Sequence, residues 1–185
     1  MRILRSSSIW YCLIMVREMF DDQRLTAMGL FVEVYEGLEA QLDLVHRRAG
    51  LSGTDFNTLI RLARSPRHRL RMSDLAAQTA LSTSGITRIV DRLERKELVR
   101  REACPGDRRS AFTVLTNAGK ELLISHIPDV TETIERWFTS ALTPEQLAAL
   151  LDALHAVRDH VRPDAVAGTQ GRQAGRSGSG ISGHH

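Results

Sequence analysis

The chain has 185 residues, of which 42% are hydrophobic and 25% charged, a composition that supports a folded core without disulfides. Its formal net charge of +3 is too small by itself to indicate a polyanionic partner. Two cysteines, Cys12 and Cys104, are too few for a disulfide framework or a cysteine metal site, as is usual in a reducing compartment. The cysteine content therefore fits a cytoplasmic protein, and we expect no metal and no cofactor.

The charge is unevenly distributed. Between Arg61 and Arg109 there are 13 Lys or Arg and 6 Asp or Glu, so this stretch carries 13 − 6 = +7 and the remainder 12 − 16 = −4. A basic centre in an acidic frame is the electrostatic pattern of a polyanion-binding surface. A solvated basic face without a ligand is the alternative.

The two ends lack the patterns of folded segments. The apolar run Ile9–Val16 is too short to span a membrane, and no small-residue cleavage site follows it. We expect residues 1–20 to be a disordered N-terminal extension, with a signal peptide as the alternative. Residues 164–185 are rich in Gly, Ser and Arg and are expected to be a disordered tail. The folded domain should then cover residues 21–163.

Long helices are predicted on both sides of the basic centre. The first covers residues 21–50, with Asp21 or Asp22 as cap and Gly50 as stop. Its apolar residues follow in steps of three and four: Leu25, Met28, Val32, Tyr35, Leu38, Leu42 and Val45. Such a long helix stays largely exposed unless another element, for example a partner subunit, packs on it.

Two helices follow the basic centre. Thr116 caps a helix expected to reach about residue 142, and Pro128 inside it should kink it. A capping box at Thr143–Gln146 opens a last helix, which Arg162-Pro163 ends. We expect one face of this last helix to point inward, formed by Leu147, Leu150, Leu151, Leu154, Val157 and Val161.

The basic centre begins with a helix that Ser52 and Asp55 cap together. Ser65-Pro66 ends it, because the residue before proline avoids the helical region. Its apolar face carries Phe56, Leu59, Ile60 and Leu62. The basic connector RHRLRM follows at residues 67–72.

Two short helices then flank a tight turn. Ser73 is expected to cap the first, over residues 74–79, and Ser82 the second, over residues 83–97, with Ala80–Ser82 as the turn. Apolar residues stand where two crossed helices would touch: Leu75, Ala76, Leu81, Ile86 and Ile89. This pattern fits a helix-turn-helix, although successive short helices are common in other helical proteins.

The outward face of the second helix is hydroxylated and basic. Its residues are Ser82, Thr83, Ser84, Thr87, Arg88, Arg92 and Arg95. The small first turn can approach a groove closely, and its amides can hold a phosphate. Arg88 can reach a base edge, where Arg–guanine is the commonest specific contact. The alternatives are structural: Ser82 as an N-cap only, and Arg92 and Arg95 as partners of neighbouring glutamates.

A β-hairpin is predicted next, with strands at residues 98–101 and 111–115 and a Pro-Gly turn after Cys104. Arg108 and Arg109 lie at or just after this turn. An arginine on a slender loop can enter a minor groove, where the negative potential is focused. Asp107 is expected to pair with one of these arginines and orient it.

Four segments carry a family resemblance: STSGITRIVDRLE at residues 82–94, LVRR at 98–101, DRR at 107–109 and LTNAG at 115–119. They resemble the winged helix-turn-helix of the MarR family, and the likeness in helix order extends over roughly residues 21–161. The resemblance implies a mainly α fold with a small β-hairpin wing, in which residues 52–116 form the winged helix-turn-helix. It also implies that helices 21–50 and 117–161 form the body of a homodimer.

The resemblance further implies a sequence-specific transcriptional regulator, usually a repressor of nearby genes. Its partners would be a pseudo-palindromic double-stranded DNA operator and a small anionic or phenolic effector. No association with a membrane is expected. By residue matching, Ser84, Thr87 and Arg88 would contact bases. Ser82 and Arg92 would contact phosphates. Arg109, with Arg108, would enter the minor groove.

Other functions are less well supported. A winged helix that binds proteins would present an apolar or acidic face, whereas this one is basic. For an enzyme, the chain has no Gly-rich phosphate loop, metal-spaced cluster or nucleophile–base pair.

Thr26 stands where some family members carry a peroxide-sensing cysteine. Cys104, near several arginines, is either redox-active or incidental. His46, Trp137 and Phe138 can line an effector pocket or fill the core.

Overall fold

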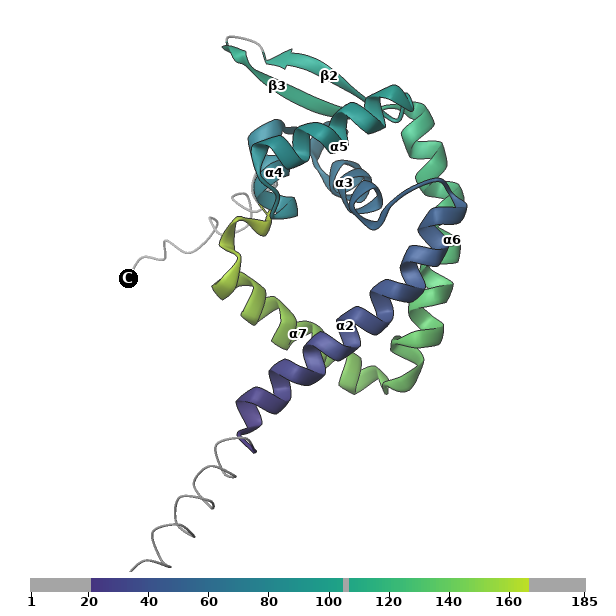
Figure 1. The fold of residues 1–185 in the computed structure, drawn as a ribbon, viewed down its shortest axis with the longest axis vertical. Helices are drawn as coiled ribbons and strands as arrows, with labels where there is room; N and C mark the ends of the chain where they lie inside the picture. The colour runs from purple at the N-terminus through teal and green to yellow at the C-terminus, as the bar shows by residue number, and fades with distance from the viewer. Residues whose placement is uncertain (1–20, 105–106, 167–185) are drawn as a thin grey trace, which may run out of the picture. The chain divides into compact units, whose positions relative to one another are not determined.

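A computed structural model of the protein describes residues 21–104 and 107–166 (Figure 1). Within these residues the fold is mainly helical, with helices α2 to α7 and a three-stranded sheet. The chain separates into two compact units, the first ending at Gln41 and the second starting at Leu42. No helix in the described part of the chain is both long and apolar enough to cross a membrane.

Helix α2 (Gln23–Arg48) begins where the sequence predicted. The Asp22 carboxylate accepts a hydrogen bond from the Arg24 amide at 2.8 Å, which satisfies one of the free N–H groups of the first turn. The chain leaves the helix through Gly50, whose φ of 68° favours glycine. The predicted apolar face of its first half is exposed, with Leu25, Met28 and Tyr35 all more than half accessible.

Helix α3 (Gly53–Arg64) has the predicted capping box. The Ser52 hydroxyl accepts from the Asp55 amide, and the Asp55 carboxylate accepts from the Ser52 amide, both at 3.1 Å. The helix ends at Ser65, before Pro66, as expected. Its Thr58, Leu59 and Leu62 side chains are completely buried and form one wall of the core.

The connector after α3 contains a strand that the sequence analysis missed. Residues Arg69–Arg71 form β1, which pairs antiparallel with β3 and places Leu70 opposite Thr113. A strand this short has only one buried apolar residue, so its alternation could not be recognised. Helix α4 (Met72–Thr79) follows without a break. The prediction that Ser73 caps it is wrong: Arg71 holds the N-cap position and makes no side-chain cap.

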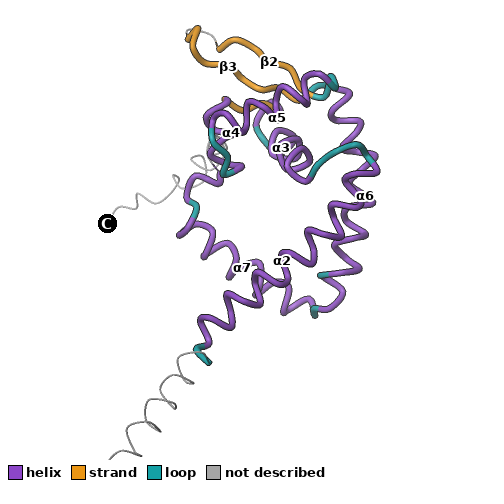
Figure 2. Tube along the Cα trace, viewed as in Figure 1, coloured by secondary structure: helices purple, strands orange, loops and turns teal. Residues whose placement is uncertain are grey.

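Helix α5 (Thr83–Arg95) follows α4 after the Ala80–Ser82 turn (Figure 2). It ends two residues earlier than predicted, because Lys96 leaves the helical conformation and Glu97 has a φ of 59°. Helices α3, α4 and α5 bury a common core. Its fully buried large side chains include Leu59, Leu62, Leu75, Ile86 and Leu93.

The sheet has the strand order β1–β3–β2, with both pairs antiparallel. Strands β2 (Val99–Cys104) and β3 (Asp107–Leu115) are longer than the predicted segments, and Figure 1 shows this hairpin reaching past α5. The register changes between Ala103 and Cys104, which marks an irregularity near the tip. The Pro-Gly turn itself lies at residues 105–106, outside the described residues.

Helix α6 (Asn117–Trp137) starts at the base of the hairpin with Thr116 as its N-cap and holds Pro128 inside it. A Cβ on Gly119 would lie 2.2 Å from the Leu98 carbonyl oxygen, so only glycine fits this close approach. The helix ends earlier than predicted, because Phe138 leaves the helical conformation and the 3-10 turn Thr139–Ala141 follows.

Helix α7 (Pro144–Val161) has the predicted Thr143–Gln146 capping box with proline at its start. The expected inward orientation of its apolar face is not found in the single chain: α7 has no buried residue, and Leu151, Val157 and Val161 are 48%, 58% and 63% exposed. Leu147 and Leu150 are half-buried, whereas Leu154 is exposed like the other three. A 3-10 turn, Pro163–Val166, follows the helix and reaches into the predicted tail.

Candidate nucleic-acid interface

The first turn of α5 is built for close approach. Ala80 takes the left-handed conformation, with φ 56° and ψ 30°, where many such turns have glycine. The Ser82 hydroxyl then accepts from the Gly85 amide at 3.1 Å and caps α5 as predicted. It also lies 3.1 Å from the Ser84 hydroxyl. The helix thus starts with small polar side chains held close to its backbone.

The two faces of α5 differ as the sequence predicted. Ile86, Ile89, Val90 and Leu93 are buried against α3 and α4. On the other face, Ser82, Ser84 and Arg88 are exposed, and Thr87 is half-buried with its hydroxyl donating to the Thr83 carbonyl at 2.7 Å. Ser84 and Arg88 are four residues apart and therefore share one side of the helix.

Arg92 makes a contact inside the protein that the sequence did not predict. Its guanidinium binds the Asp55 carboxylate through Nε and NH2, at 3.0 and 2.5 Å from Oδ1. The Asp55 side chain is only 3% exposed, whereas that of Arg92 is 38% exposed. Asp55 thus serves the capping box of α3 and also anchors α5. Sequence reasoning considered only nearby glutamates as partners of Arg92, because a contact between residues 37 positions apart leaves no local signal.

A second ion-pair cluster joins the hairpin to α5. Arg101 on β2 binds Asp91 at 2.6 Å and also binds Glu94, whose carboxylate accepts from the Arg101 amide. Partial burial lowers the pKa of Arg101, but hydrogen bonds and charge interactions with the two carboxylates outweigh it and raise the pKa overall. The β2–β3 hairpin is therefore held to α5 by ion pairs, a link that the sequence did not predict.

The base of the wing carries further arginines. Glu102 binds Arg100 at 2.5 Å and lies 3.6 Å from Arg69, and the Arg69 guanidinium stacks 4.5 Å above the Phe112 ring. These contacts link all three strands.

At the tip, the structure describes only the backbone of residues 107–110, as part of β3. The roles predicted for the side chains of Asp107, Arg108 and Arg109 therefore lie outside the described part of the chain. Cys104, the residue before the tip, is a buried free thiol.

Two buried histidines, His46 at the end of α2 and His126 on α6, both contact the ring of Phe56 on α3. Nδ1 of His46 is 2.9 Å from Nε2 of His126, and the Phe56 ring stacks on His46 with centroids 4.6 Å apart. Burial lowers the pKa of both histidines, and the charge of His126 lowers that of His46 further. Sequence reasoning named His46 and two aromatics, Trp137 and Phe138, as pocket candidates. The structure brings His46 to Phe56 and His126 instead.

Comparisons with known proteins agree on one family. A family model described as the MarR family matches residues 49–110. The HTH-type transcriptional regulator MhqR of Bacillus subtilis (strain 168) is 30% identical over 134 residues, 71% of this chain and 90% of that protein. The transcriptional repressor MprA of Escherichia coli (strain K12) is 26% identical over 151 residues, 80% of this chain and 86% of the repressor.

Solved structures agree with these relatives. Sco3205 of Streptomyces coelicolor, a MarR family transcriptional regulator solved in complex with DNA, aligns with a TM-score of 0.71 and 34% identity. The alignment covers 76% of this chain and 89% of that one. AbsC, a MarR family transcriptional regulator of the same organism, aligns with a TM-score of 0.71 and 37% identity, over 77% of this chain and 96% of its own.

Proposed function

We propose, because this chain belongs to the MarR family of DNA-binding transcriptional regulators, that it is a homodimeric repressor of nearby genes that reads a pseudo-palindromic operator. The observation that carries this proposal is the outward face of α5, where small hydroxyl residues and Arg88 are exposed over a buried apolar face. Such a protein would act in the cytoplasm.

The proposed DNA contacts are of three kinds: to base edges, to a phosphate and to the minor groove. Ser84, Thr87 and Arg88 would meet base edges in the major groove, since they lie on one face of α5, where Ser84 and Arg88 are exposed and Thr87 is half-buried. Ser82 and the first amides of the helix would hold a phosphate. Arg108 and Arg109 would enter the adjacent minor groove, with Asp107 orienting them.

The phosphate contact expected of Arg92 is revised, because Arg92 binds a carboxylate of the protein itself. Its guanidinium is already held by Asp55, so we propose that it mainly positions α5 and reaches a phosphate only through its exposed edge. An arginine that positions a recognition helix affects all DNA sequences alike, which is also the behaviour of a phosphate contact.

Dimerisation is supported by the exposed apolar residues of α2 and α7. Leu25, Met28 and Phe31 on α2, and Val157 and Val161 on α7, are each more than half exposed in the single chain. Large exposed apolar faces of this kind mark interaction surfaces. Two recognition helices in a dimer would lie about 34–36 Å apart, one turn of DNA.

An electrophoretic shift assay with the DNA upstream of the gene tests the proposal. Binding should weaken steeply with salt, with a log–log slope of about −0.9 per phosphate contacted. Arg88→Ala should lose discrimination by about 1–3 kcal/mol at one base pair of each half-site. Arg109→Ala should weaken binding to the operator.

Three results would oppose the proposal: salt-insensitive binding, unchanged operator affinity in Arg109→Ala, or no shift with any upstream fragment. The last result would favour the alternative, a winged helix that binds another protein. The basic and hydroxylated face of α5 counts against that alternative.

A further inference from the structure

A short turn after α7 ties this helix to α4. The 3-10 turn Pro163–Val166 follows α7 and contacts α4, and together with Arg162 it forms a C-terminal strap. Ala165 is 8% exposed and is the only buried residue among residues 144–165. Helix α7 itself contributes only exposed and half-buried residues, so the strap makes the deepest contact of this segment with the rest of the described chain.

Arg162, at the start of the strap, holds the end of α4. It is half-buried, and one guanidinium nitrogen donates to the carbonyl of Ala77 at 2.8 Å and to that of Gln78 at 3.3 Å. Carbonyls in the last turn of a helix lack some or all of their helical partners, and the helix dipole favours a cation beside them. Arg162 therefore supplies both a donor and a charge that suit the C-terminal end of α4.

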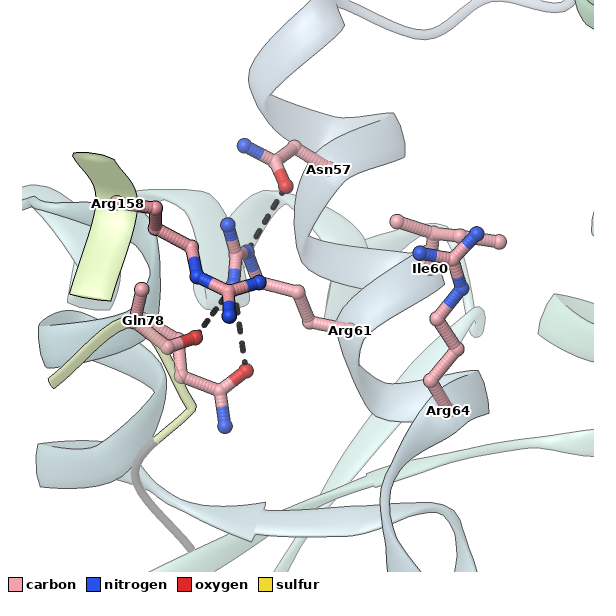
Figure 3. Close-up of a pocket in the computed structure, with 7 residues that line it drawn as sticks. Asn57, Ile60, Arg61, Arg64, Gln78 and Arg158 are labelled. Carbon is pink, nitrogen blue, oxygen red and sulfur yellow. Dashed lines mark hydrogen bonds between the residues drawn. The ribbon is translucent and has the colours of Figure 1, made fainter. Parts of the chain in front are cut away.

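A second arginine bonds the same strap from another helix. Arg61 on α3 donates to the Ala165 carbonyl at 3.1 Å and to Gln78 Oε1 at 3.4 Å. Figure 3 shows Arg61 extending from α3 toward Gln78 on α4. Gln78 is only 2% exposed, so this contact lies inside the protein. The strap is therefore bonded both to α3 and to the end of α4.

The strap and α6 hold α5 at opposite ends. Helix α4 passes into α5 through the turn Ala80–Ser82, so a bond to Gln78 fixes the start of α5. After the other end of α5, the Thr116 amide donates to the Leu98 carbonyl at 3.1 Å and joins this end to the start of α6. Figure 1 shows α7 meeting α4, and α6 meeting the far end of α5. A helix held at one end can pivot, whereas a helix held at both ends keeps its direction.

We infer that Arg162 is a positioning residue, which fixes the direction of α5 relative to α7 by bonding the end of α4. The inference rests on the proposed function, in which α7 packs against a second copy and two α5 helices read one operator. Those helices must lie about 34–36 Å apart to enter successive major grooves. Because α5 is fixed relative to α7 in each chain, the dimer accepts one spacing between the half-sites. The strap thus sets the length of operator that the dimer tolerates.

Hydrogen exchange of the full chain without DNA tests the anchoring. In Arg162→Ala, amides at the end of α4 and the start of α5 should exchange about tenfold faster, the effect of losing one charge-assisted hydrogen bond. The control is Arg158→Ala, which removes a cation one turn earlier. The described side-chain bonds of Arg158 go to Asp159 on the same helix, so this variant should exchange like the wild type. Unchanged exchange in Arg162→Ala would overturn the anchoring.

Two DNA fragments test the spacing: the operator located by the shift assay, and the same operator with one base pair inserted at its centre. The insertion moves the half-sites about 3.4 Å apart and rotates them by about 35°. The wild type and Arg158→Ala should bind the lengthened operator about tenfold or more weakly than the original one. In Arg162→Ala this ratio should fall to about threefold or less, because a pivoting α5 follows the displaced half-site.

A merely structural role of Arg162 would weaken binding to both fragments equally, and an unchanged ratio would therefore overturn the inference. Arg162→Lys keeps a charged donor and should restore most of the wild-type ratio. If Arg162→Ala is unstable, Arg162→Gln replaces it and should show the same loss of discrimination. If the wild type binds no upstream DNA, the proposed function fails, while hydrogen exchange still decides whether Arg162 anchors α4.

Discussion

At the scale of single residues, the least expected feature is the contact between His46 and His126. One ring must donate and the other accept, so the 2.9 Å contact requires at least one neutral ring. Burial dominates and lowers the pKa of both rings, although the negative charge of Asp43 raises the pKa of His46 and that of Asp129 raises the pKa of His126. The hydrogen bond between the two rings therefore persists only while at least one of the rings is neutral.

This contact predicts a pH dependence of stability. Unfolded histidine has a pKa of about 6.5, and both folded pKa values lie lower, so the unfolded chain binds more protons below about pH 6.5. The stabilisation by the pair is complete above that pH and is lost as the pH falls through the folded pKa values. Urea unfolding at about pH 7.5 and about pH 5.5 should show this loss.

A matched variant isolates the effect. His126→Gln should flatten the acid-side decrease, whereas the exposed His155→Gln should leave it as in the wild type. Identical slopes in the wild type and His126→Gln would mean that other groups cause the pH dependence.

At the scale of elements, the Arg92–Asp55 pair joins α5 to the start of α3. Arg92→Ala would leave a carboxylate that is 3% exposed without its cation. Breaking a fully buried pair costs about 3–5 kcal/mol, but the exposed side of Arg92 reduces this, so we expect a loss of roughly 2 kcal/mol. Chemical denaturation measures it, with Arg88→Ala as a control that should change stability by less than about 0.5 kcal/mol. Equal stability of the two variants would rule out an anchoring role for Arg92.

Elements were predictable where the signal is local. The caps Ser52, Ser82, Thr116 and Thr143 were all placed correctly, because a cap depends on residues within one helical turn. The buried face of α5 was predicted for the same reason. Strand β1 and the start of α4 were not, since both depend on pairing with β3, more than 40 residues later.

The candidate site divides in the same way. Exposure of Ser84 and Arg88 follows from helical periodicity and was predicted. The contacts of Arg92 and Arg101 and the histidine pair join segments that are distant in the sequence. A single sequence carries no signal for such contacts beyond the presence of the residue types.

At the scale of the whole molecule, the exposed apolar face of α7 predicts an oligomer. Val157→Glu places a charge on that face, where Val157 is 58% exposed in the single chain. If a second chain covers this face, the buried charge should dissociate the dimer. Light scattering coupled to size-exclusion chromatography should then report a monomer, and circular dichroism should still show helix.

The control is Ala148→Glu, since this exposed residue precedes Val157 by about two and a half helical turns and therefore lies on the opposite side of α7. It should remain dimeric. A dimeric Val157→Glu variant would show that this face of α7 is not the interface.

The glycine at position 119 has a mechanical consequence. Because Gly119 lets α6 touch the backbone of Leu98, and Thr116 also donates to the Leu98 carbonyl at 3.0 Å, the start of α6 and the base of the hairpin form one stiff joint. A joint without side chains between its two backbones has little room to slide. We therefore expect α6 and the hairpin to move together. A small tilt at the far end of α6 should displace the wing instead of being absorbed at the joint.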